Sequence, residues 1–173
     1  CGSPEPPRPS LTEAPTHERY TSALAEFGLD KTALGGDWLS AARRVLESPV
    51  DARLPFSEEG YLPPAVPSAV AYRFDLRRGR RLIVDVRFES TEPARVYVDL
   101  FDARPGQPPV RVGGAEPGQM SFEYEARRDG TFILRLQPEL LRRHSRKVRE
   151  LHGATDDLLV PGRFGVAQSE VVA

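Results

Sequence analysis

The amino-acid sequence predicts a mainly β protein: an antiparallel β-sandwich of six to eight strands, preceded by a proline-rich arm and a small helical hairpin. After residue 70, apolar residues alternate with polar ones over several short segments. Turn residues separate these segments at intervals of roughly ten residues, as is typical of a sandwich. Before residue 49 the apolar residues instead recur at helical spacing.

The chain divides into five expected segments. These are a proline-rich arm (1–15), a helical hairpin (16–48), a proline-rich linker (49–69), a β-sandwich domain (70–162) and a C-terminal tail (163–173). With 173 residues, of which 39% are hydrophobic, the chain is long enough for one domain with a modest core.

Two helices are expected within residues 16–48. Thr16 is a good N-cap, and Gly28 is expected to end the first helix because glycine tolerates the left-handed backbone found there. The second helix is expected to open near Asp30 and to end before Pro49, with the glycine pair 35–36 dividing it into a short turn and a longer helix. Helical spacing predicts the buried stripes of the two helices: Tyr20, Ala23, Leu24 and Phe27 in the first, and Leu34, Trp38, Ala41 and Val45 in the second.

The strands are expected to bury one face between two sheets. Segments 70–76 and 82–88 are expected to form a hairpin around the turn Arg77–Arg80, followed by strands at 96–100, 110–112, 120–124, 132–136 and 158–160. Residues 138–152 fit either a helix or a returning strand. The expected inward residues are Tyr72, Phe74, Val84, Val86, Val98, Phe122, Phe132 and Leu134.

The single cysteine of the sequence is Cys1, which small residues and a proline-rich stretch follow. This start resembles a mature bacterial lipoprotein, in which the cysteine thiol carries a diacylglycerol and the chain lies on the periplasmic face of a membrane. No run of 18 apolar residues occurs, so we expect the attachment to depend on acyl chains at Cys1. The alternative is a fragment that happens to begin at a cysteine.

A second resemblance is carried by several segments between residues 33 and 141. Together these segments resemble the non-catalytic N-terminal region of bacterial envelope lipoproteins that carry a lysostaphin-type zinc peptidase domain. This resemblance implies a pre-peptidase-like β-sandwich. The segments are Ala33–Leu39, Leu54–Tyr61, Ala69–Gly79, Glu92–Val96, Asp99–Phe101 and Arg128–Leu141.

The peptidase motifs of that family, H-x-x-x-D followed by H-x-H, are not met here. Among the three histidines, His17, His144 and His152, only His152 has an aspartate four positions later, at Asp156, and no H-x-H follows. Such peptidases need both motifs to hold zinc and activate water. We therefore expect no catalytic residue, no metal and no cofactor.

Arginines are concentrated in three places. They lie at residues 77–81, at 127–128 and at 142–149, and each cluster is expected to bind lipid head groups, to bind an acidic partner or to remain a solvated face. The chain has 24 basic and 25 acidic residues, a net charge of -1, so nucleic acid is not an expected partner. The residues expected to bind a partner are Pro4, Pro6, Pro7, Pro9, Arg142, Arg143 and Arg146.

These observations predict a non-enzymatic, lipid-anchored periplasmic accessory subunit that binds and stabilises a membrane protein complex. A small lipoprotein of this kind resembles the extra periplasmic subunits of bacterial photosynthetic reaction-centre complexes, which implies a reaction centre with its cytochrome as one specific partner. The alternative is a non-catalytic module associated with an envelope metallopeptidase that acts on peptidoglycan.

Overall fold

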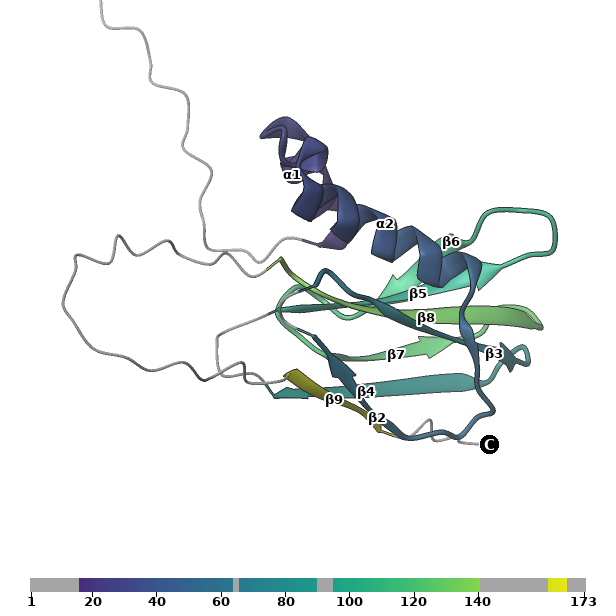
Figure 1. Ribbon diagram of the computed structural model, residues 1–173. Coiled ribbons are helices and arrows are strands. Elements are labelled where there is room, and N and C mark those ends of the chain that lie inside the picture. Colours follow the sequence, from purple (N-terminus) through teal and green to yellow (C-terminus); the bar gives the residue numbers. More distant parts are fainter. Residues whose placement is uncertain (1–15, 64–65, 90–94, 141–161, 168–173) are drawn as a thin grey trace, which may run out of the picture.

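The computed structural model describes residues 16–63, 66–89 and 95–140, and the backbone of residues 162–167 (Figure 1). Two β-sheets pack face to face, and a helical hairpin covers the outer face of the larger sheet, which confirms the expected mainly β sandwich with a hairpin. The elements are α1 (His17–Glu26), the 3-10 helix η1 (Leu29–Lys31), α2 (Ala33–Glu47), β1 (Val50–Asp51), β2 (Glu58–Leu62), β3 (Val70–Leu76), β4 (Arg81–Glu89), β5 (Val96–Ala103), β6 (Val110–Gly114), β7 (Ser121–Glu125), β8 (Gly130–Pro138) and β9 (Gly162–Ala167).

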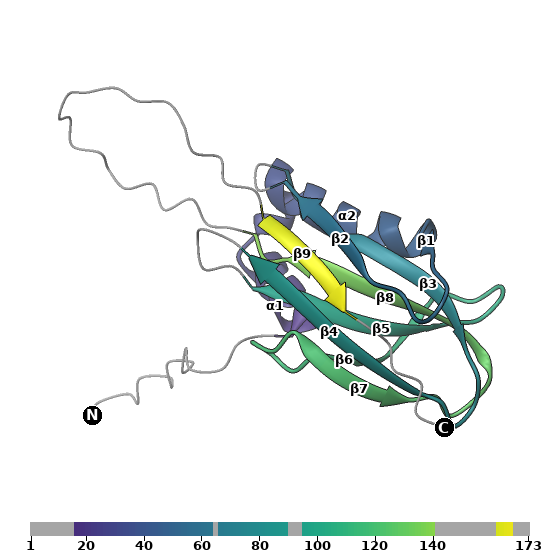
Figure 2. The ribbon, with the colours of Figure 1, turned by 90° about the horizontal axis from the view of Figure 1, so that it is seen from below.

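The larger sheet has the strand order β1-β3-β8-β5-β6, and the smaller one the order β2-β9-β4-β7 (Figure 2). The pairs are antiparallel with one exception among the described strands: β1 runs parallel to β3, with Val50 opposite Tyr72. The expectation of a wholly antiparallel sandwich is therefore corrected at this edge. β1 follows α2 directly, and the helix returns the chain to the sheet in the same direction as β3.

The expected hairpin between residues 70–76 and 82–88 is wrong. β3 pairs with β1 and β8, whereas β4 pairs with β7 and β9, so the turn Arg77–Arg80 carries the chain from one sheet to the other. The apolar residues of both strands face the same core from opposite sides. An alternating pattern is satisfied equally by this arrangement and by a hairpin, so it does not distinguish them.

The expected inward face is confirmed. Seven of the eight predicted residues are at most 3% exposed, and the eighth, Phe122, is partly buried against the core. The seven are Tyr72, Phe74, Val84, Val86, Val98, Phe132 and Leu134.

β5 and β8 are buried on both faces because the helices cover the outer face of their sheet. In β5 the even-numbered residues from Val96 to Leu100 face the core, and Tyr97 and Phe101 pack under the hairpin. The same alternation in β8 places Arg135 and Gln137 under the hairpin. Charged and amide side chains at these positions need partners there, since burying them unpaired is costly.

Three strands lie where the sequence showed no alternating pattern. β1 and β2 lie within the proline-rich segment 49–69, and β9 begins at Gly162 and continues into the expected tail. β9 pairs with both β2 and β4, so a long-range pairing defines it rather than a local signal. The strand expected at 158–160, and residues 141–152 of the ambiguous segment, lie outside the described residues.

The hairpin begins at the expected cap. Thr16 Oγ1 accepts a hydrogen bond from the Arg19 amide at 3.3 Å, and Gly28, with φ of 67°, follows α1. α2 starts at Ala33 with Thr32 as its N-cap, later than expected, and it continues through the glycine pair. A Cβ at Gly35 would lie 2.0 Å from a carbonyl oxygen of η1, so glycine permits the close approach of these two helices.

The buried stripes of the hairpin differ from the predicted ones at its tip. Leu24, Trp38 and Ala41 are buried as expected, but Phe27 is 73% and Leu34 is 49% exposed. Leu34 lies in the first turn of α2, and Phe27 is the C-cap residue of α1. Trp38 is 1% exposed and donates a hydrogen bond from Nε1 to the Pro138 carbonyl at 2.8 Å. Trp38 therefore lies at the last residue of β8, and the first turn of α2 precedes this contact.

Candidate functional site

The residues predicted to bind lipid or a partner all lie outside the described residues. They are Cys1, Pro4, Pro6, Pro7, Pro9, Arg142, Arg143 and Arg146. Two of the three arginine clusters do lie in the described structure, and both are at the same end of the sandwich. We call this the arginine-rich end; its residues are Arg77, Arg78, Arg80, Arg81, Arg104, Arg127 and Arg128.

Hydrogen bonds between two turns create the arginine-rich end. The turn from β3 to β4 and the turn from β7 to β8 lie about fifty residues apart in sequence, and both cross between the sheets. The Gly79 amide donates to the Ala126 carbonyl at 2.7 Å, and the Ala126 amide donates to the Arg80 carbonyl at 2.9 Å. The Arg78 amide donates to Oδ1 of Asp129 at 2.6 Å. These bonds fix the backbone positions from which the arginine side chains extend.

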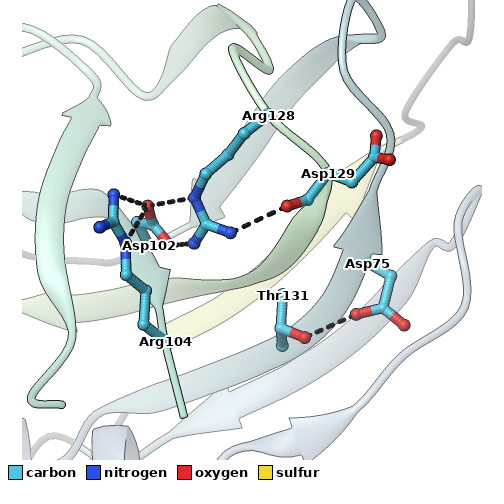
Figure 3. A network of polar contacts seen from close by, with 6 residues as sticks. All are labelled: Asp75, Asp102, Arg104, Arg128, Asp129 and Thr131. Carbon is cyan, nitrogen blue, oxygen red and sulfur yellow. Dashed lines mark hydrogen bonds and ion pairs between the residues drawn. The ribbon is translucent and has the colours of Figure 1, made fainter.

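Asp102, which is 7% exposed, binds two of these arginines (Figure 3). Arg128 forms a two-pronged ion pair with its carboxylate, with Nε 2.9 Å from Oδ2 and Nη2 bonded to Oδ1. Arg104 approaches Oδ2 from the other side at 3.4 Å. Arg128 also donates to the Asp129 carbonyl at 2.8 Å, which links β5 to the turn before β8. These contacts give Arg128 and Arg104 a structural role.

Other arginines of this end remain available. Arg77, Arg78 and Arg127 are exposed, and none of them forms an ion pair with another described residue. Arg81 makes a long contact of 3.5 Å with Glu123, in which both side chains are more than half exposed. Exposed guanidinium groups on fixed turns can bind carboxylates or phosphates by charge-assisted hydrogen bonds.

The opposite end of the sandwich buries its polar groups under the hairpin. His17 Nε2 donates to the Gln137 side-chain oxygen at 2.7 Å, and the Gln137 amide nitrogen donates to the Trp38 carbonyl at 2.9 Å. The His17 ring stacks on Trp38 with ring centres 4.8 Å apart and meets the Tyr97 ring edge-on at 5.3 Å. These contacts attach α1 and α2 to the end of β8.

A buried carboxylate lies beside this cluster. Asp99 accepts hydrogen bonds from Arg135 at 2.8 Å and from Arg111 at 2.7 Å, and Arg135 also lies over the Phe101 ring at 4.9 Å. Burial, and then the nearby Arg135 cation, lower the pKa of His17 from 6.5 to about 4. His17 is therefore neutral near pH 7, and its ring nitrogen is engaged by Gln137.

These groups are far apart in the sequence, and no sequence motif predicts them as a cluster. The sequence does indicate that these groups need partners, because Asp99, Arg135 and Gln137 stand among almost entirely apolar residues of two strands. Such residues imply a second covered face on the sheet. His17 was considered only as a metal ligand, and its position one residue after the cap of α1 gave no indication of its stacking partner.

The described residues contain neither a cluster of metal-binding side chains nor a membrane-spanning helix. Within the parts of the chain that the structure describes, no three His, Cys, Asp or Glu side chains gather as a metal site would require. None of the described helices is long and apolar enough to cross a membrane.

Comparison with known proteins identifies no family for this chain. No protein-family model matches the sequence, and no curated protein matches it. Among solved structures, the pre-peptidase C-terminal domain of a Bacillus anthracis collagenase matches with 10% identity and a TM-score of 0.45, covering 71% of this chain and 95% of that domain.

Periplasmic inhibitors of g-type lysozyme, named PliG, also match. The Aeromonas hydrophila protein has 13% identity and a TM-score of 0.42, covering 68% of this chain and 95% of its own. The Salmonella Typhimurium protein has 14% identity and a TM-score of 0.35, covering 71% and 100%. At these values no argument about fold or function is based on the matches. The sandwich is established by the strand register described above.

Proposed function

We propose that this chain is a non-enzymatic, lipid-anchored accessory subunit on the periplasmic face of a bacterial membrane, and that its arginine-rich end binds an acidic surface of another envelope protein. The observation that carries the proposal is the group of exposed arginines, Arg77, Arg78 and Arg127, which two hydrogen-bonded turns hold at one end of the sandwich. The anchor is inferred from the lipoprotein-like start at Cys1.

The geometry favours recognition of a folded partner. The turns are fixed by backbone hydrogen bonds and by the ion pairs of Asp102, so the backbone loses little further freedom when a partner binds. Arginine is common at protein interfaces because its planar group forms paired hydrogen bonds with carboxylates. A complementary acidic surface would also increase the rate of association, most strongly at low salt.

The non-enzymatic part of the proposal is supported by what the buried titratable groups do. His17 is stacked between rings and bonded to Gln137, and Asp99 and Asp102 are each bound by two arginines. A general base must be free to accept a proton from a substrate. These groups instead hold the hairpin and the turns in place.

Contacts from other parts of the chain belong to the same proposal. Pro4, Pro6, Pro7 and Pro9 and the arginines 142, 143 and 146 are proposed as additional partner contacts. Acyl chains on Cys1 would confine the chain to the membrane and raise its effective concentration near a membrane partner, so each contact can be weak. The proposal names no particular complex, because neither the described residues nor the comparisons point to a photosynthetic reaction centre.

The test is to identify the neighbours of the tagged, full-length protein by cross-linking in intact cells, mild solubilisation and mass spectrometry. The triple variant Arg77→Ser, Arg78→Ser, Arg127→Ser should lower recovery of the main partner by about tenfold at low salt, and by less at high salt because screening already weakens the wild-type contact. The matched control replaces Arg19, Arg43 and Arg44, three exposed arginines on the helices, and should keep full recovery.

Equal recovery with the two triple variants would show that the arginine-rich end is not the interface. Recovery of peptidoglycan fragments in place of a protein neighbour would support the alternative, a non-catalytic module associated with an envelope metallopeptidase.

A further inference from the structure

The tip of the helical hairpin exposes more apolar surface than the rest of the hairpin. We define the hairpin tip as residues 27–34, which comprise the C-cap of α1, η1 and the start of α2. Phe27 is 73%, Leu29 is 39% and Leu34 is 49% exposed. Asp30 and Lys31, the two charged residues of the tip, have opposite signs, so the tip carries no net charge.

The hairpin tip is held rigidly although it projects from the sandwich. The Thr32 amide donates to the Leu29 carbonyl at 3.1 Å, and the Thr32 hydroxyl donates to the same carbonyl at 2.6 Å. The Gly35 amide donates to the Thr32 hydroxyl at 3.1 Å, and the backbone at Gly35 packs directly against η1. The exposed side chains therefore extend from a backbone that these hydrogen bonds fix.

The hairpin tip lies toward the end of the molecule where the described chain begins. Thr16 caps α1 next to His17, which is bonded to Gln137 near the end of β8. α1 has ten residues and is about 15 Å long, so the tip is about that distance from Thr16. Figure 1 shows α1 at the left of the molecule, whereas the turn after β3 lies at the right. The arginine-rich end is thus opposite, about 30 Å away along the nine residues of β8.

We propose that the hairpin tip is a membrane-binding site, in which Phe27, Leu29 and Leu34 enter the interface of a phospholipid bilayer. This inference rests on the proposed function, since it takes Cys1 as the point of attachment. The fifteen residues before Thr16 span at most about 50 Å when extended, which exceeds the length of α1, so the tip can reach the bilayer that holds Cys1. Insertion of the tip would orient the arginine-rich end away from the membrane.

A bilayer fits the observations better than a protein pocket does. Three exposed apolar side chains stand within eight residues at the turn between two helices, and the tip as a whole has no net charge. Apolar side chains that enter only the headgroup and acyl boundary bind weakly by themselves. Attachment at Cys1 would make this weak binding effective, because it keeps the tip close to the lipid.

The test attaches the full-length protein to phosphatidylcholine vesicles by coupling the thiol of Cys1, the single cysteine of the sequence, to a maleimide lipid. A tryptophan is placed at the tip by Phe27→Trp, and brominated acyl chains in the vesicles quench its fluorescence on contact. The matched control is Val110→Trp, on a residue that is 59% exposed near the arginine-rich end. The unsubstituted protein gives the contribution of the buried Trp38.

We expect brominated lipid to lower the emission of the Phe27→Trp protein by about twofold, and to leave the Val110→Trp protein and the unsubstituted protein nearly unchanged. Adding Leu29→Ser and Leu34→Ser to Phe27→Trp should remove most of the quenching. Equal emission of the two tryptophan variants in brominated vesicles would overturn the proposal. Shielding of the tip in native membranes but not in protein-free vesicles would also overturn it, and would assign the tip to a protein partner.

Because the coupling is chemical, this result is independent of how the native protein is attached. The intact mass of the native protein tests acylation of Cys1 separately. An unmodified Cys1 would refute the anchor without deciding whether the tip binds lipid, so the two failures are distinguishable.

Discussion

Each end of the sandwich contains an aspartate of β5 that is bound by two arginines, but the two sites differ in burial. Under the hairpin, the side chains of Asp99 and Arg135 are 4% and 7% exposed. At the arginine-rich end, the side chain of Asp102 is 9% exposed, but its partners Arg128 and Arg104 are 37% and 56% exposed. Water reaches both arginines of Asp102, whereas at Asp99 it reaches Arg111, which is 45% exposed, but is largely excluded from Arg135.

This difference separates a structural site from a candidate binding surface. Removing one partner of an ion pair that is shielded from water is strongly destabilising, because the remaining buried charge has no partner. An exposed pair gains less, since water and salt screen it. The hairpin end therefore keeps Asp99 and Arg135 largely out of water, whereas the arginine-rich end keeps guanidinium groups in solvent.

The largest effect is expected from Asp99→Asn. The substitution leaves the buried Arg135 without a carboxylate, and we expect the free energy of unfolding to fall by about 3 kcal/mol. Urea denaturation followed by circular dichroism measures the change. A loss below about 1 kcal/mol would mean that the two sites do not differ as described.

A smaller effect is expected from pH at the hairpin end. Burial and Arg135 lower the pKa of His17 from 6.5 to about 4 in the folded protein. Between pH 6.5 and pH 4 the unfolded chain therefore binds a proton at His17, whereas the folded protein does not. Stability from this group is therefore lost as the pH falls below 6.5, by about 2 kcal/mol between pH 7.5 and pH 5. Besides Arg135, the groups that act on the pKa of His17 are Gln137, Asp99 and Arg111.

The measurement is urea denaturation at both pH values for the wild-type protein and for His17→Gln. The variant lacks the titrating ring, so its loss of stability between the two pH values should be smaller by about 2 kcal/mol. Identical losses in the two proteins would assign the acid sensitivity to other groups, such as the carboxylates.

The smallest effect is expected from Asp102→Asn at the arginine-rich end. Its arginines remain partly hydrated after the change, so we expect a loss of about 1–2 kcal/mol in the free energy of unfolding. Asp51→Asn is the matched control, because the Asp51–Arg73 pair at 2.6 Å is exposed on both sides and should contribute less than about 1 kcal/mol. A loss at Asp102 as large as that at Asp99 would remove the distinction between the two ends.

The sequence predicted the core and the hairpin well where the signal is local. Thr16 is a predictable cap because threonine there can bond an amide three residues away, and the inward residues of β3 and β4 follow from simple alternation. Alternation shows which face of a strand is buried. It does not show which strand is the neighbour, and for this reason the turn Arg77–Arg80 was mistaken for a hairpin.

The candidate site depended on long-range contacts, and so it could not be read from the sequence. Arg77, Arg78 and Arg127 were noted as parts of two separate clusters, but their common location depends on bonds between turns distant in sequence. Likewise, Phe27 and Leu34 fit a buried helical stripe, but they lie at the turn between the two helices and are 73% and 49% exposed. The predicted contacts of the arm and of residues 142–146 stay predictions.

The position of β9 in the smaller sheet has a consequence for how the protein folds. β9 lies between β2 and β4, so Glu58 pairs with Val166, more than one hundred residues later in the chain. A chain that is synthesised from its N-terminus therefore cannot complete this sheet until residues 162–167 have emerged. Until then β2 and β4 lack a shared neighbour, and closing so large a loop slows the final step of folding. Nascent chains of this protein would spend that interval with open strand edges, which are the surfaces that holding chaperones protect from aggregation.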